Sequence, residues 1–365
     1  MAGYIYQYDQ WPKFTWDDKE IHVTLGKVRH LQGKTLGQMS TLGFSIKEET
    51  ILSTLTLDVL KSSEIEGEML NYEQVRSSIA RKLGLEYAGL VHVDRNVEGV
   101  VEMMLDATQK YNEPIDHKRL YGWHAALFPT GWSGMHRIDI GSYRKGEMQV
   151  VSGPMGREKI HYQAPSPERV KKEMDTFLNW FNRETKIDIV LKAAIAHFWF
   201  IIIHPFDDGN GRIARAISDM LLARSEDSSQ RFYSLSNQIL IEKRVYYKIL
   251  QKVQHSNGDI TEWLDWFLNC LYRALMSTDE IMKRVLQKAN FWDKHKETFL
   301  NSRQRLMLNK LLDGFEGKLK TSKWAKIAKC SADTALRDIK DLVEKGVLKQ
   351  EEQGGRSTNY ELIEA

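Results

Sequence analysis

The sequence has little cysteine and little net charge. Its 365 residues hold two cysteines, Cys270 and Cys330, without a Cys-x-x-Cys spacing, which excludes a disulfide framework and a structural zinc site. The formal net charge of +3 is too small for the strong global field of a nucleic-acid coat protein. So little cysteine fits a reducing compartment, and we expect a cytoplasmic protein.

We also expect neither a targeting segment nor a membrane span. The first residues, MAGYIYQYDQWPKF, lack a basic region followed by an apolar stretch, so we expect no signal peptide. The most apolar run, 189–203, contains Lys192 and His197 and falls short of the roughly 20 residues that cross a bilayer. We expect a buried helix there and no membrane partner.

What is present is a foldable chain with helical patterning. A content of 42% apolar and 10% aromatic residues excludes a disordered chain. At about 150 residues per domain, a chain of 365 residues is expected to form two or three domains. Apolar residues recur at helical spacing, which predicts a mainly α fold with helices over 47–66, 72–83, 93–111, 116–128, 167–183 and 187–203. Strand-like runs at 148–152 and 159–162 predict a β-hairpin.

The end of the chain has a different pattern. Three short helical stretches precede two strand-like runs, the order of a winged helix-turn-helix; they span 302–312, 322–328, 331–345, 347–351 and 358–362. We therefore expect an N-terminal helical extension over 1–100, a central domain over 101–298 and a small winged-helix domain over 299–365.

Two kinds of partner suit this last part. Residues 301–365 carry 13 basic and 10 acidic side chains, and DNA is one candidate, with Lys349 and Arg356 near phosphate. A protein partner is the alternative, because Asp333, Asp338 and Asp341 on the recognition helix would repel a DNA backbone.

The densest group of polar residues follows the most apolar helix. Residues 204–215 read His-Pro-Phe-Asp-Asp-Gly-Asn-Gly-Arg-Ile-Ala-Arg. Pro205 forces the chain out of the helix, so His204 should lie at the mouth of a pocket, placed to take a proton. Gly209 and Gly211 can bring backbone N–H groups to an anion at the start of the next helix.

Two arginines and a carboxylate complete this group. Arg212 and Arg215 lie three residues apart on one helix face and suit a polyphosphate. Asp208 is a hard oxygen ligand of the kind that holds Mg²⁺ together with phosphate oxygens. The alternative is that His204 only caps a helix, the Gly-Asn-Gly segment is only a turn and the arginines are only surface charge. The joint presence of all these groups within twelve residues favours phosphate-transfer chemistry instead.

Residues 204–215 match the motif HPFx[D/E]GNGRxxR, and on that ground the chain resembles the Fic family. The resemblance implies a Fic-type helical bundle that transfers AMP from ATP to a target protein. It implies His204 as the general base on a Ser, Thr or Tyr hydroxyl and Asp208 as the Mg²⁺ ligand. The implied nucleotide-binding residues are Asp208, Gly209, Asn210, Gly211, Arg212 and, at the γ-phosphate, Arg215.

The resemblance extends beyond this motif. Upstream it includes Trp123-His124, the run 141–144 and a hairpin similar to the family's flap, whose implied nucleotide-binding residues are Val150, Val151, Ser152 and Gly153. The hairpin edge would hold an extended segment of a target protein or of the chain itself. Downstream, Tyr247 is implied near adenine and Gln254 stands where relatives carry a base-contacting Asn; a core role for the tyrosine is equally open.

A second motif precedes the first. Ser62, Glu66 and Gly67 fit the family's inhibitory motif [S/T]xxxE[G/N], which implies that the Glu66 carboxylate pairs with Arg215 and blocks the γ-phosphate site. Two alternatives stay open: a de-AMPylase that uses Glu66 as its base, and a nucleotide-responsive DNA-binding regulator. The presence of His204 and Asp208 favours an enzyme; a homodimer is left open.

Overall fold

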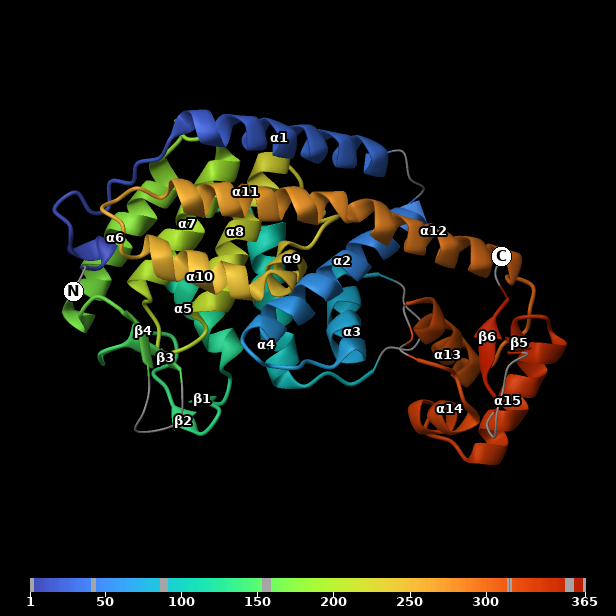
Figure 1. Cartoon of the computed structure of the whole chain (residues 1–365). Coiled ribbons are helices and arrows are strands. Elements are labelled where there is room, and N and C mark those ends of the chain that lie inside the picture. The colour runs from blue at the N-terminus through green and yellow to red at the C-terminus, as the bar shows by residue number, and fades with distance from the viewer. Residues whose placement is uncertain are drawn as a thin grey trace. The chain divides into compact units, whose positions relative to one another are not determined.

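The computed structural model describes residues 3–40, 44–85, 91–152, 159–313, 315, 317–351 and 358–363. They form two compact units, residues 1–278 and 279–365. Both are mainly helical, which confirms the predicted mainly α fold; the winged-helix assignment of the second unit stays a prediction (Figure 1). The finer division of the first unit near residue 100 stays a prediction.

The first unit opens with an arm over residues 3–17 that contains the short helix η1 (Ile5–Gln7). Its α-helices are α1 (Asp18–Ser40), α2 (Phe44–Ile65), α3 (Tyr72–Leu83), α4 (Arg95–Gln109), α5 (His117–Leu127), α6 (Pro167–Arg183), α7 (Ile189–Ile203), α8 (Asn210–Glu226), α9 (Leu235–Ile241), α10 (Lys243–Val253) and α11 (Thr261–Met276). Its strands form two antiparallel hairpins, β1 (Trp132–Ser133) with β2 (His136–Arg137), and β3 (Gln149–Ser152) with β4 (Lys159–Gln163).

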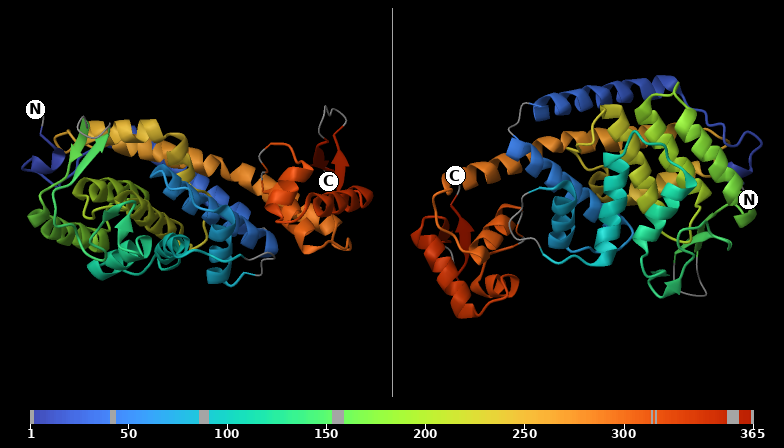
Figure 2. Two further views of the ribbon diagram at one scale, coloured as in Figure 1. Left: turned by 90° about the horizontal axis from the view of Figure 1, so that it is seen from below. Right: turned by 180° about the vertical axis from the view of Figure 1, so that it is seen from behind.

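Helices α7 and α8 form the centre of this unit. α7 is apolar on every side, and all but two of its 15 residues are buried. Helices α6 and α11 pack against α7, while α2, α4 and α5 pack against α8. Helix α1 lies alongside α11, as Figure 1 and the rear view of Figure 2 show. The 204–215 motif therefore lies where the two central helices join.

Local signals explain most helix ends. Asp188 caps α7 by accepting a hydrogen bond from the Val190 N–H at 2.8 Å, and Gly84 ends α3 in the left-handed conformation. Helices α3 and α6 begin and end at the predicted residues. The sequence did not predict the β1–β2 hairpin, because a two-residue strand is too short to show alternation.

The arm supports the β3–β4 hairpin. Its Tyr4 and Tyr6 rings pack edge-on against Tyr162 of β4, and the Tyr6 hydroxyl donates to the Gln163 carbonyl at 3.0 Å. The Ile5 N–H donates to the carbonyl of Gln254, after α10, at 2.7 Å. The arm thus links the hairpin to the end of α10.

The second unit contains α12 (Thr278–Lys294), which begins at the boundary, α13 (Ser302–Leu312), α14 (Thr321–Ile327), α15 (Ala332–Glu344) and an antiparallel pair, β5 (Leu348–Gln350) with β6 (Tyr360–Leu362). Trp324, Ile339 and Leu342 are among the residues of its own apolar core. The predicted order of three short helices and a hairpin is present. None of the helices in the described ranges is long and apolar enough to cross a membrane.

The packing of α4 on α5 yields a stability prediction. A Cβ at Gly99 of α4 would lie 1.8 Å from the Ala126 carbonyl oxygen of α5, whereas a Cβ at the exposed Gly122 would meet nothing within 4 Å. We expect Gly99→Ala to lower the free energy of unfolding by about 3 kcal/mol, because backbone must move to relieve the overlap.

The matched control is Gly122→Ala, which should be neutral or stabilising by up to about 1 kcal/mol. Urea unfolding of both variants beside wild type measures the difference. Equal stabilities would contradict the close approach of the two helices.

Candidate active site

The junction of α7 and α8 has two residues in the left-handed conformation. His204 ends α7 at φ 50° and Gly209 precedes α8 at φ 81°. A Cβ at Gly209 would also lie 2.9 Å from the Phe128 ring, so this position needs glycine for two reasons. The chain thereby turns sharply and directs the N-terminus of α8 toward the loop 204–209.

The side chain of Asn210 holds this loop. Its Oδ1 accepts from the Phe206 N–H at 3.0 Å and its Nδ2 donates to the Phe206 carbonyl at 2.8 Å. The buried Phe206 ring stacks on His124 of α5 with ring centroids 4.3 Å apart. The side-chain amide of Asn210 is thus used inside the loop, so a contact with the predicted phosphate would have to come from its backbone.

Arg144 connects the loop to the β3–β4 hairpin. Its buried guanidinium donates to the carbonyls of His204 at 2.8 Å and Gly146 at 2.9 Å, and to that of Pro165. Its backbone N–H donates to the Pro205 carbonyl at 2.9 Å. Gly146 and Pro165 flank the hairpin, so one side chain fixes both hairpin ends against the histidine.

The imidazole of His204 is half-buried and neutral at pH 7. Burial lowers its pKa to about 4, and the nearby Arg144 guanidinium acts in the same direction. Its Nδ1 lies 3.2 Å from the Ile201 carbonyl, which can only accept, so the ring proton belongs on Nδ1. Nε2 is left as a free base, as a proton acceptor requires.

Asp208 is half-buried beside the start of α8. Its Oδ1 accepts from the Gly209 N–H at 2.5 Å, and its Oδ2 accepts from the Ser133 hydroxyl of β1. Among the described residues no group of three His, Cys, Asp or Glu side chains could hold a metal. Asp208 is thus a single carboxylate, which suits a cation that takes its other ligands from phosphate and water.

The end of α2 forms a tight C-terminal turn. Gly67 has φ 84° and its N–H donates to the Glu64 carbonyl at 3.0 Å, while the Glu68 N–H donates to the Ser63 carbonyl at 3.0 Å. These two bonds are a Schellman motif, in which glycine is favoured at the left-handed position. The turn places the carboxylates of Glu66 and Glu68 on either side of Gly67, both toward α8.

Each arginine of the motif meets one of these carboxylates. Arg215, 1% exposed, donates to the Ser62 hydroxyl and carbonyl and to Glu66 Oε1, all at 2.8 Å. Arg212 donates to Glu68 Oε2 at 2.7 Å and lies over the Phe128 ring at 5.0 Å.

Glu66 also covers the first turn of α8. A Cβ at Gly211 would lie 2.1 Å from the Glu66 carboxylate oxygen. Four residues singled out in the sequence, Ser62, Glu66, Gly211 and Arg215, therefore meet at one point.

The sequence reasoning missed Glu68, Ser133 and the role of Arg144. One feature of the sequence could have indicated Glu68: it lies two residues after Glu66, and the structure pairs these two carboxylates with the two arginines of the motif, which are three residues apart. Nothing in the sequence paired Ser133 with a residue 75 positions away.

The β3–β4 hairpin carries the predicted flap residues. Val150 and Val151 are both partly exposed, because the strand register shifts between them; Val150 pairs with Tyr162 and Val151 with Ile160. Ser152 ends β3 opposite Lys159, and Gly153 lies outside the described residues. The Tyr162 hydroxyl donates to the Ile202 carbonyl, which ties the hairpin to α7 near His204.

The two downstream candidates differ in position. Tyr246 is buried with its hydroxyl 3.0 Å from His197 Nε2, whereas Tyr247 is 43% exposed. Burial raises the pKa of Tyr247 to about 12, and the negative charge of Glu66 adds to the rise. Gln254 is buried and donates to the His161 carbonyl of β4 at 2.6 Å, so a base contact would require this bond to break.

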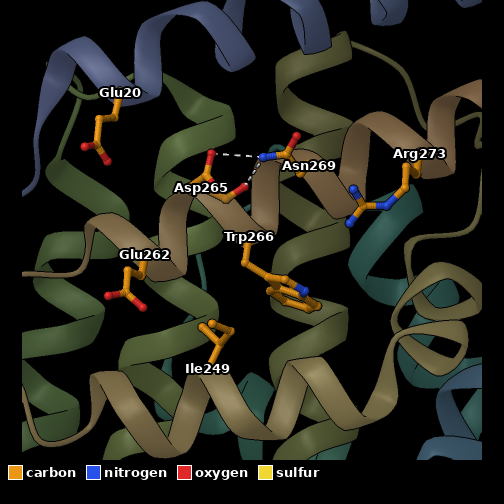
Figure 3. A pocket seen from close by; sticks show the side chains of 7 residues that line it. All are labelled: Glu20, Ile249, Glu262, Asp265, Trp266, Asn269 and Arg273. Atoms are coloured by element: carbon orange, nitrogen blue, oxygen red, sulfur yellow. Dashed lines mark hydrogen bonds between the residues drawn. The ribbon is translucent and has the colours of Figure 1, made fainter.

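A separate pocket of about 370 Å³ lies between α1, α10 and α11 (Figure 3). Glu20, Glu262, Asp265, Trp266 and Arg273 are among its lining residues, and none of the predicted site residues is. Asp265 accepts from the Asn269 amide at 2.9 Å and Arg273 pairs with Glu242 at 2.6 Å, so local contacts use much of its polar lining.

Comparison with known proteins finds family matches for two parts of the chain. Residues 114–222 match the family described as Fic/DOC family, and residues 4–85 match a domain of unknown function, DUF4172. A Fic family protein from Desulfovibrio desulfuricans has the same fold over 96% of this chain and 98% of its own, with TM-score 0.55 and 19% identity. A Fic domain containing signaling protein from Bacteroides thetaiotaomicron covers 72% of this chain and 98% of its own, with TM-score 0.51 and 20% identity.

Curated relatives are named protein adenylyltransferases. The chain is 29% identical to the adenylyltransferase of Caenorhabditis elegans; the alignment covers 67% of this chain and 46% of that protein. It is 24% identical to the adenylyltransferase of Nematostella vectensis, with 60% of this chain and 47% of that protein covered. A probable protein adenylyltransferase of Aquifex aeolicus is 29% identical over half of each chain. The chain thus spans about half the length of these relatives.

The state of His204 can be measured directly. In ¹⁵N-histidine NMR spectra we expect His204 to be neutral at pH 6.5, with its proton on Nδ1 and a titration midpoint near pH 4, because burial disfavours the cation.

The histidine signal that is absent from the spectrum of the His204→Asn variant is the signal of His204. Asparagine suits this position because it tolerates the left-handed backbone. A midpoint above pH 6, or a proton on Nε2 in the neutral ring, would rule out Nε2 as a base prepared in the folded protein.

Proposed function

Because the chain carries a domain of the Fic/DOC family, we propose that it is an autoinhibited protein adenylyltransferase. It transfers AMP from ATP to a Ser, Thr or Tyr hydroxyl of a target protein, or of itself. One observation supports this most: the unprotonated Nε2 of His204, the N-terminus of α8 and the two motif arginines belong to one short, rigidly held segment. The names of the curated relatives point the same way.

The start of α8 supplies the phosphate site. The first N–H groups of a helix lack intrahelical partners and attract anions, and Gly211 allows a ligand to approach the backbone closely. Arg212 and Arg215 add two fixed guanidiniums on the same side. Asp208 would hold Mg²⁺, which supplies positive charge to the phosphates when bound.

The transfer step needs one base and one leaving group. The hydroxyl oxygen of the target bonds to the α-phosphorus while the bond from that phosphorus to the bridging oxygen breaks, and pyrophosphate leaves. The hydroxyl proton passes to His204 Nε2. Arg144 supports this role because its bond to the His204 carbonyl fixes the residue that carries the base.

The β3–β4 hairpin is the proposed target-binding flap. Its two strands leave the edge of β3 without a neighbouring strand among the described residues, and Val150 and Val151 are partly exposed there. An extended segment can add to such an edge through backbone hydrogen bonds. Arg144 would then hold the bound hydroxyl in register with His204, since it fixes both hairpin ends.

Glu66 is the proposed inhibitor. Its carboxylate is 2.8 Å from Arg215 and lies against Gly211, so it takes the place that we assign to the γ-phosphate. ATP would bind productively only when the end of α2 moves or Glu66 rotates away. In a de-AMPylase the same carboxylate would instead activate water, and the labelling test below separates the two.

Removing Glu66 should activate the enzyme. We expect Glu66→Gly to label protein from [α-³²P]ATP and Mg²⁺ about 10- to 100-fold faster than wild type, the factor expected for one charge-assisted hydrogen bond. Glu66→Gly/His204→Asn should not label, because the asparagine amide cannot take the proton.

Glu64→Ala is the control, since Glu64 pairs with Lys61 at 2.7 Å and not with the motif arginines. A Glu66→Gly variant that fails to label itself or a cell lysate contradicts the transferase. Release of AMP from labelled protein by wild type, lost in Glu66→Gly, would favour the de-AMPylase.

A second candidate function, DNA binding by the second unit, is favoured by one observation. Two of the three acidic residues expected to repel DNA are held by their own unit: Asp338 accepts from Arg303 at 2.7 Å, and Asp341 accepts from Gln304 at 2.7 Å and pairs with Lys345. The exposed part of α15 presents Arg337 and Lys340 together with the third acidic residue, Asp333, and Lys326 of α14 is exposed as well.

This surface can be tested on the full chain. We expect Arg337→Gln/Lys340→Gln to weaken binding to a fluorescent duplex DNA in anisotropy titrations, and added salt to weaken wild type, because phosphate contacts release counterions. Lys296→Gln removes one charge elsewhere in the unit as a control. Absence of binding at low salt would leave a protein as the partner of this unit.

A further inference from the structure

The inhibitory segment presents two carboxylates to α8. Glu66 pairs with Arg215, and Glu68 pairs with Arg212 at 2.7 Å. We propose that Glu68 sets the affinity of the site for nucleotide, because it competes with phosphate for the Arg212 guanidinium. This inference rests on the proposed function, since it takes Arg212 as a phosphate ligand.

The surroundings of Arg212 leave it few alternatives. Its side chain is 6% exposed, its guanidinium lies over the Phe128 ring, and Gly209 approaches that ring so closely that a Cβ there would lie 2.9 Å from it. A buried guanidinium without an anion is costly, so Arg212 keeps Glu68 until another anion replaces it. A phosphate oxygen is the replacement that the helix N-terminus favours.

Glu66 and Glu68 hold different arginines. No hydrogen bond or ion pair between Glu66 and Arg212, or between Glu68 and Arg215, is present among those of the described residues. Truncating Glu66 alone therefore removes the carboxylate partner of Arg215, which keeps its bonds to Ser62, and leaves Arg212 neutralised by Glu68. With both carboxylates in place the four charges sum to zero, which offers little attraction to a polyphosphate.

The turn at Gly67 couples the two carboxylates. The Gly67 and Glu68 N–H groups both bond to the last turn of α2, so an outward movement of this helix end would withdraw both acids together. Glu68 is about a third exposed, with 36% of its side chain accessible, so water can replace Arg212 as its partner. Exchange of Glu68 for phosphate is therefore easier than loss of a fully buried pair.

The experiment measures binding rather than transfer. Isothermal titration of the full chain with ATP, with adenosine as the uncharged probe, is run on Glu66→Gly, Glu66→Gly/Glu68→Gln and Glu66→Gly/Glu64→Gln. We expect the Glu68→Gln change to tighten ATP binding about 3- to 10-fold, the effect of removing one partly exposed competing carboxylate. Adenosine affinity should not change, and the Glu64→Gln control should bind ATP as Glu66→Gly does.

Other results overturn the inference. Equal ATP affinity of Glu66→Gly with and without Glu68→Gln rejects it, as does an equal gain for ATP and adenosine, or a gain of the same size in the Glu64→Gln control. Tighter ATP binding without any AMP transfer by Glu66→Gly would support the competition and reject the proposed function. AMP transfer by Glu66→Gly with no change of ATP affinity on Glu68→Gln would support the proposed function and reject the competition by Glu68. Absence of ATP binding in all three variants would reject the competition and the proposed function.

Discussion

The burial of Arg215 is the constraint that organises the site. A guanidinium that is 1% exposed needs hydrogen-bond acceptors on several sides, and the end of α2 provides three through Ser62 and Glu66. This need brings a segment about 150 residues away onto the first turn of α8. The same contact that completes the fold thus takes the place where the proposed ligand would bind.

This dual use means that the arginines of the site already have partners in the structure. The groups proposed for chemistry, His204 and Asp208, are held by the backbone of α7 and α8, by Arg144 and by Ser133, none of which needs a ligand. The groups proposed for phosphate are held by carboxylates instead. A nucleotide therefore replaces partners that already exist, and its affinity depends on what it displaces as well as on what it binds.

Residues 204–215 could be predicted because they are contiguous. Pro205, Gly209 and the helix that follows determine the geometry locally, and the structure brings these residues together as expected. The pairing of Glu66 with Arg215 was accessible only through a family motif. Apolar spacing also placed most helices of the chain within a few residues of their observed ends.

Long-range contacts of single side chains could not be predicted. Arg144, Ser133 and Glu68 belong to segments without a distinctive pattern, and each matters through one or a few hydrogen bonds across the fold. Asp333, Asp338 and Asp341 counted against DNA binding in the sequence, which does not reveal that α13 uses the carboxylates of Asp338 and Asp341. Polar partners of this kind are decided by tertiary structure.

The shifted register between Val150 and Val151 has a consequence for solubility. An exposed edge strand with consecutive valines invites endless strand-to-strand stacking between molecules, which is a route to aggregation. A bulge bends the strand and breaks the ladder at that point, so a long flat partner cannot pair along it. The exposed edge of β3 can therefore pair with one short strand, as proposed for the target protein, and still be a poor template for fibres.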